Sequence, residues 1–103
     1  MEEILNEVMQ ERIRQNEKWG EQNHNPVEWI SILLEEVGEA SKEALNYYFK
    51  NPAESHLEKE LAESKGNLLA YNRLQNYRKE LIQTAAVAVQ MVECLDRNEL
   101  KKL

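Results

Sequence analysis

The amino-acid sequence predicts an all-α fold, and three observations support this prediction. The 103 residues include only three Gly and two Pro, too few for the many turns of a sheet protein of this size. Residues that favour helices, such as Glu, Lys, Leu and Ala, are plentiful. Apolar residues also recur at steps of three and four, which is typical of amphipathic helices. We therefore expect a bundle of three to four helices that forms one domain over residues 1–103.

The first helix is expected from Glu2 to about Lys18, because apolar side chains follow helical spacing there. They are Ile4, Leu5, Val8, Met9 and Ile13. Gly20 and several Asn residues then interrupt the pattern, which predicts a loop that runs to Asn25.

The second helix is expected from Pro26 to about Phe49. Asn25 is a favoured N-cap, Pro26 suits the first helical position, and Glu28 completes a capping box. Pro52 lies just beyond the expected end, where a helix cannot easily continue.

The last helix is expected from Leu68 to about Arg97, and the tail from Asn98 to Leu103 is expected to fray. Between the two longer helices, residues 54–67 predict an inserted, highly charged surface helix followed by a turn. A bundle this small often completes its core with another copy, so we expect a homo-oligomer, either a dimer or a tetramer.

The charge and hydropathy patterns exclude several classes of function. Thirteen basic against nineteen acidic residues give a net charge of −6, which argues against binding polymeric nucleic acid through its phosphates. The chain has no apolar stretch long enough to span a membrane and no export signal at its start. The single Cys94 suits a buried thiol in a reducing compartment. We therefore expect a cytoplasmic protein without a membrane partner.

The second helix carries three acids, Glu35, Glu36 and Glu39, within its most apolar part. At about 100° per residue, Glu36 projects close to Trp29 at the edge of the apolar face, and Glu39 follows one turn later on the same side. Two carboxylates at a core edge repel each other unless a cation joins them. This arrangement predicts a cation site.

The last helix offers matching oxygen ligands. Glu80 projects on a mostly apolar face, and Gln83 follows one turn later. Antiparallel packing of the two longer helices would bring Glu36, Glu39, Glu80 and Gln83 around one space. Oxygen ligands without His or Cys favour Mg²⁺, with Mn²⁺ as a substitute.

These two motifs resemble those of the MazG-like members of the all-α nucleoside triphosphate pyrophosphohydrolase superfamily. The first motif is Glu-Glu-Val-Gly-Glu, from Glu35 to Glu39, and the second runs from Glu80 to Gln83 and opens an alanine-rich stretch. The segment from Lys18 to His24, followed by Trp29, is also similar to a segment of short MazG-like proteins. The resemblance covers the N-terminal half and the last helix.

The resemblance implies a specific reaction and specific residue roles. In that family, the acids of an EExxE and an ExxD motif bind Mg²⁺, which holds the triphosphate of a nucleotide. By position, the metal ligands here would be Glu36, Glu39, Glu80 and Gln83, where Gln83 replaces the usual Asp with a neutral amide. The activity would be hydrolysis of a nucleoside triphosphate, ribo- or deoxyribo-, to the monophosphate and pyrophosphate, as housecleaning of the nucleotide pool.

Other roles follow from sequence position. Glu35 is the candidate general base, because the other acids are assigned to the metal. Arg14 and Lys18 lie where they would reach phosphate, and Trp19 where it would stack on a base.

The same residues also have structural interpretations that involve no catalysis. Acids at helical spacing usually form a solvated face. Trp29 suits a core or interface anchor, and His24 a structural hydrogen bond near a helix start. The aromatic cluster at residues 47–49 suits packing, an oligomer contact or a base. The rival function is a helical oligomer that keeps the MazG-like fold and binds nucleotide or a protein without catalysis.

Overall fold

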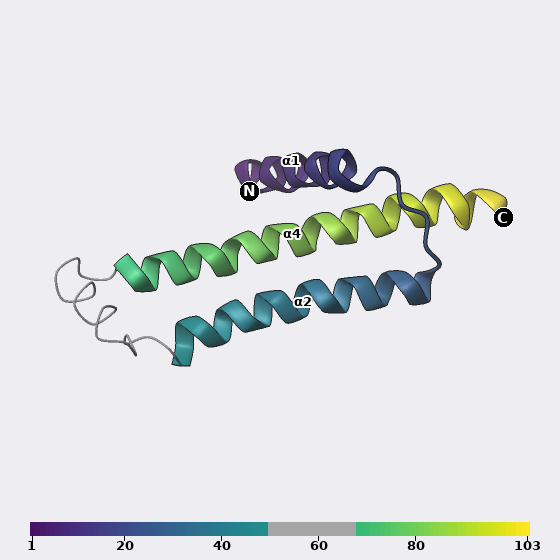
Figure 1. The fold of residues 1–103 in the computed structure, drawn as a ribbon. Helices are drawn as coiled ribbons and strands as arrows, with labels where there is room; N and C mark the ends of the chain where they lie inside the picture. The colour runs from purple at the N-terminus through teal and green to yellow at the C-terminus, as the bar shows by residue number, and fades with distance from the viewer. Residues whose placement is uncertain (50–67) are drawn as a thin grey trace.

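The computed structural model describes residues 1–49 and 68–103, and within them all regular structure is helical (Figure 1). Helix α1 spans Glu2–Trp19, α2 spans Pro26–Phe49, α4 spans Leu68–Asn98, and a short 3₁₀ helix, η1, spans Leu100–Lys102. The all-α prediction is confirmed for these residues. The helix and turn predicted at residues 54–67 lie outside them.

The start of α2 and the end of α1 both follow from local sequence signals. Asn25 Oδ1 accepts a hydrogen bond from the Glu28 backbone N–H at 2.8 Å, and Glu28 Oε1 accepts one from the Asn25 N–H at 3.0 Å. These reciprocal bonds form the predicted capping box. At the end of α1, Gly20 adopts φ 73°, a conformation that other residues rarely adopt.

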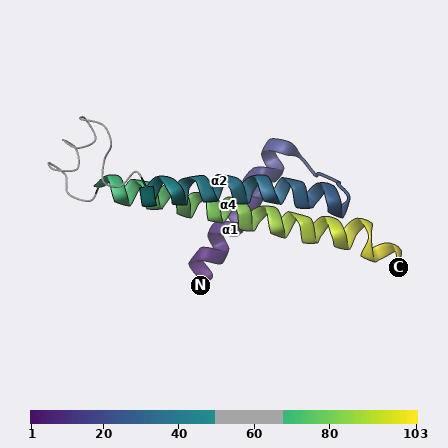
Figure 2. The ribbon, with the colours of Figure 1, turned by 90° about the horizontal axis from the view of Figure 1, so that it is seen from below.

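Helices α2 and α4 pack side by side as an antiparallel pair, and α1 packs on α4 (Figure 1). Figure 2 shows that α1 crosses the long pair obliquely instead of running beside it. The core between α2 and α4 centres on Trp29, Val87 and Cys94, with Leu33 and Met91 packed against it. Trp29 is 3% exposed, which confirms it as a core anchor, and Cys94 is buried as predicted.

Helix α1 differs from expectation in the side that it buries. Four of its apolar side chains remain about half exposed: Ile4, Leu5, Met9 and Ile13. Two ion pairs join it to α4: Glu7 with Arg78 at 2.7 Å, and Arg12 with Glu93. The amphipathic pattern therefore identified the helix correctly but not the face that packs within the chain.

The connection between α1 and α2 is held by the end of α4. Asn23 Oδ1 accepts hydrogen bonds from Asn98 Nδ2 at 2.6 Å and from Arg97 Nη2 at 2.9 Å. The C-terminal tail was expected to fray, yet residues 100–102 form the 3₁₀ turn η1. None of the described helices is long and apolar enough to cross a membrane.

Candidate acidic site

The packing of α2 against α4 brings the predicted acids together. Glu36 and Glu80 are both half-buried, whereas Glu35 and Glu39 are exposed. Burial raises the pKa of Glu36, and the charges of Glu80 and Glu39 raise it further. The two sequence motifs therefore face a common region, as the sequence predicted.

The pKa of Glu80, which lies on the opposite helix α4, is also raised. Burial raises the pKa of Glu80 first, and the neighbouring charges of Glu39 and Glu43 add to this, against a smaller opposing effect from Lys79. Each half-buried carboxyl group is thus held near like charges.

Helix α1 supplies an acid that the sequence reasoning missed. Glu11 is 7% exposed, and its charge contributes to the raised pKa of both Glu36 and Glu80. Its carboxylate accepts hydrogen bonds from Arg14 Nη1 at 2.5 Å and from Gln15 Nε2 at 3.4 Å. The available signal was its helical spacing with Val8, which lies on the side of α1 that packs inward. We define Glu11, Glu36, Glu39 and Glu80 as the acidic cluster.

Gln83 lies beside this cluster, between α4 and α1. Its backbone carbonyl accepts a hydrogen bond from Gln15 Nε2 at 3.3 Å. Its side chain is half-buried and lines a cavity of about 250 Å³ together with Glu11 and Arg14. The structure thus places Gln83 near the acidic cluster on the side that α1 covers.

A second cavity, of about 260 Å³, joins Glu36 to the loop after α1. Trp19 borders it with a ring that is 62% exposed, and Lys18 Nζ lies 4.9 Å from the centre of that ring. Three glutamine amides also line it: Gln15, Gln22 and Gln90. An exposed aromatic ring and several amides therefore surround an opening that leads to a carboxylate of the acidic cluster.

The amides of this second cavity include buried groups. Gln90 is 4% exposed and donates a hydrogen bond to Gln22 Oε1 at 3.5 Å. Gln15 Oε1 is buried without a hydrogen-bond partner. A buried acceptor without a partner lowers the stability of the folded state.

Arg14 and His24 are both held by contacts within the chain. Arg14 is paired with Glu11, so it is already committed to one carboxylate. His24 packs edge-on against Trp29 with ring centres 4.8 Å apart, and its backbone carbonyl accepts a hydrogen bond from Cys94 Sγ at 3.5 Å. These contacts confirm the structural interpretation of His24.

The carboxylates of the acidic cluster are not arranged around a single metal position. Within the part of the chain that the structure describes, no three His, Cys, Asp or Glu side chains are arranged to hold a metal ion. Glutamate side chains have three rotatable bonds, so rotamer changes would be needed to bring the carboxylates together. The donor chemistry itself, carboxylates with an amide, is that of a Mg²⁺ or Mn²⁺ site. Comparisons with family models, with curated proteins and with solved structures find no match to this chain.

Proposed function

We propose that the protein is a Mg²⁺-dependent nucleoside triphosphate pyrophosphohydrolase of the MazG-like type, with Mn²⁺ as a substitute metal. One observation supports this most: Glu36, Glu39 and Glu80 converge from two helices on a half-buried region that also holds Glu11. Keeping such like charges together is unfavourable without a cation. The proposed protein acts as a cytoplasmic homo-oligomer in control of the nucleotide pool.

In this proposal, Glu36, Glu39, Glu80 and Gln83 hold the metal. When bound, the metal neutralises the triphosphate charge and lowers the pKa of water. Glu35 is exposed next to the cluster and would take a proton from the attacking water. Water attack breaks the bond between the α- and β-phosphates and releases the nucleoside monophosphate and pyrophosphate.

The cavity beside Glu36 supports a nucleotide as substrate. Trp19 offers a flat, exposed ring on which a base would stack. The glutamine amides offer both donors and acceptors to the edge of a base. Lys18 Nζ lies over the Trp19 ring and would approach phosphate from there, whereas Arg14 would do so only after leaving Glu11.

The test measures pyrophosphate release from a panel of ribo- and deoxyribonucleoside triphosphates with Mg²⁺, with Mn²⁺ and with EDTA. We expect metal-dependent release from a subset of the panel, and a loss of at least a hundredfold in Glu36→Gln and Glu39→Gln, as is typical when catalytic electrostatic groups are removed. Glu17→Gln, an exposed acid on α1, is the matched control. Unchanged release in both cluster variants would show that the site assignment is wrong.

A second function is favoured by Gln83. Its neutral amide brings no charge to the metal, which weakens a site built for catalysis. The alternative protein binds nucleotide or a protein partner on the same fold without hydrolysis. Nucleotide binding without pyrophosphate release across the whole panel would favour this alternative.

A further inference from the structure

The loop between α1 and α2, residues 20–25, is held by side chains from the last turns of α4. Arg97 contacts three consecutive residues of this loop. Its Nη2 donates hydrogen bonds to Asn23 Oδ1 at 2.9 Å and to the Gln22 carbonyl at 3.3 Å, and its Nε lies 3.3 Å from Glu21 Oε1. The guanidinium therefore holds one backbone carbonyl and two side chains of the loop at the same time.

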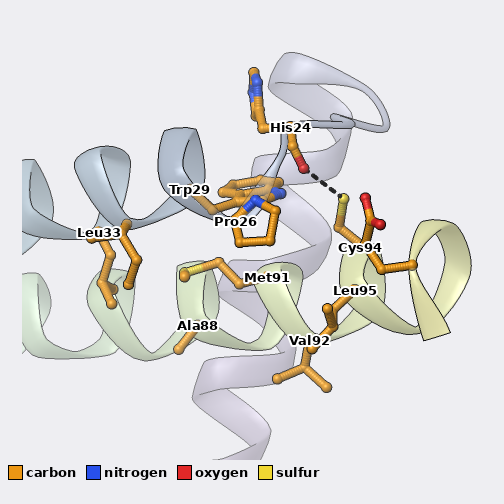
Figure 3. Close-up of a pocket in the computed structure, with 11 residues that line it drawn as sticks. His24, Pro26, Trp29, Leu33, Ala88, Met91, Val92, Cys94 and Leu95 are labelled. Atoms are coloured by element: carbon orange, nitrogen blue, oxygen red, sulfur yellow. Dashed lines mark hydrogen bonds between the residues drawn. The ribbon is translucent and has the colours of Figure 1, made fainter.

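Two neighbours of Arg97 on α4 contact the same loop. Asn98 Nδ2 donates a hydrogen bond to Asn23 Oδ1 at 2.6 Å. One turn earlier on α4, Cys94 Sγ donates to the His24 carbonyl at 3.5 Å, and Figure 3 shows these two groups turned toward each other. The loop is thus held at four consecutive positions, and one helix supplies all of these contacts.

The held loop contributes to the wall of the second cavity. Trp19, the last residue of α1, and Gln22, within the loop, both line that cavity together with Glu36. Gln22 Oε1 also accepts a hydrogen bond from Gln90, which is 4% exposed. Arg97 therefore fixes the backbone of Gln22, while Gln90 fixes its side chain. Arg97 itself lines a different cavity, of about 450 Å³.

We propose that Arg97 is a positioning residue for the nucleotide, because it holds the loop that keeps Trp19 and Gln22 in the wall of the second cavity. This inference rests on the proposed function, in which a base stacks on Trp19. Arg97 lies roughly 25 Å along α4 from Glu80, at about 1.5 Å of rise per residue, so its removal leaves the acidic cluster in place. Its substitution should weaken binding of the base and leave the chemical step unchanged.

An arginine suits this role better than a lysine. Its planar guanidinium presents several N–H donors in a fixed fork, so that one side chain reaches three loop residues at once. A lysine would keep a favourable positive charge near the C-terminal end of α4, but its single ammonium group does not hold several acceptors in a fixed geometry. Arg97→Lys therefore separates positioning of the loop from general stabilisation of the helix end.

The first test compares kcat and KM for pyrophosphate release in Arg97→Ala, in Arg97→Lys and in Lys101→Gln. The last variant is the control, because it removes a positive charge from η1. We expect KM to rise about tenfold in both Arg97 variants, since stacking on a displaced ring is lost, with kcat within about twofold of the wild type. The control should keep the wild-type KM. An unchanged KM in either Arg97 variant overturns the proposal, and so does a fall in kcat without a rise in KM.

A second test needs neither metal nor nucleotide. The indole N–H groups of Trp19 and Trp29 give separate NMR signals in ¹⁵N-labelled protein, and Trp19→Phe assigns them. We expect the order parameter of the Trp19 indole to fall in Arg97→Ala, because a helix end frays when the loop that follows it is released. The order parameter of Trp29, which is 3% exposed in the core, should stay as in the wild type.

Two outcomes of this second test overturn the proposal. An unchanged Trp19 order parameter would show that Arg97 does not hold the end of α1, and a fall at both tryptophans would show that Arg97 stabilises the core instead. A wild type that neither binds nor hydrolyses nucleotide would overturn the proposed function, whereas the order parameters would still show whether Arg97 holds the loop.

Discussion

At the scale of single residues, Glu36 lies where its charged form is unfavourable, and it is also a proposed metal ligand. Its pKa is raised because burial and the neighbouring acids Glu80 and Glu39 disfavour its charged form. The position weakens the folded state unless a cation is bound. A residue that lowers stability at a candidate site is typical of a functional group rather than of a structural one.

The raised pKa determines how stability depends on pH. A carboxyl group whose pKa is higher in the folded than in the unfolded state binds more protons when folded, so its contribution is present at low pH and lost as pH rises through the folded-state pKa. We expect Glu36→Gln to raise the urea midpoint of the metal-free protein at pH 7, with a smaller gain near pH 4. Urea titrations in EDTA at both pH values check this. A lower midpoint at pH 7 would contradict it.

Gln83 offers a second residue-scale prediction. Gln83→Asp adds a negative charge beside the acidic cluster, so Mg²⁺ should bind several-fold more tightly. Gln83→Asn keeps the neutral amide with the length of Asp and is the matched control. Calorimetric titration with Mg²⁺ measures both. Equal affinities for the two variants would mean that Gln83 does not contact the metal.

At the scale of elements, the capping box fixes where α2 begins and therefore where its acids lie. Asn25→Ala removes the acceptor for the Glu28 N–H, and we expect a loss of about 1 kcal/mol in the free energy of unfolding. Asn25→Asp keeps an acceptor at this position and should lose little. Urea denaturation of the three proteins at pH 7 provides the comparison. Unchanged stability in Asn25→Ala would mean that the Asn25 side chain does not stabilise the start of α2.

The elements were largely predictable from the sequence because their signals are local. The start of α2 follows from Asn25, Pro26 and Glu28, and its end at Phe49 agrees with the prediction. The convergence of Glu36 with Glu80 was also predictable, since each projects from the apolar side of its helix.

The packing of α1 was not predictable, because it depends on pairs distant in sequence. Glu7 with Arg78, and Arg12 with Glu93, hold polar surfaces together that no periodicity identifies. Glu11 is buried by this packing, so its place in the acidic cluster was missed. Local patterns locate helices, whereas ion pairs between helices select which face of α1 packs.

At the scale of the whole molecule, the chain is elongated. Its radius of gyration is 17.6 Å, whereas a compact domain of this length has about 13 Å. An elongated pair of helices with one apolar side buries little core within a single chain.

This shape leads to a prediction about thermal unfolding. If folding is linked to dimerisation, mass action makes Tm rise with protein concentration. We expect Tm to rise by several degrees between 1 and 100 μM in the wild type. It should stay constant in Val92→Glu, because Val92 is an apolar side chain of α4 that is 56% exposed within the single chain. Differential scanning fluorimetry at several concentrations measures this. A concentration-independent Tm in the wild type would argue against linked assembly.

The two tryptophans also give the protein its own optical readout. Trp29 is 3% exposed in the core, whereas Trp19 is 62% exposed beside the cavity that reaches Glu36. Unfolding should therefore shift the emission of Trp29 toward longer wavelengths, while a stacked base should quench that of Trp19. Single-tryptophan variants, Trp19→Phe and Trp29→Phe, separate the two signals, so that ligand binding and loss of the core can be followed in one unlabelled sample.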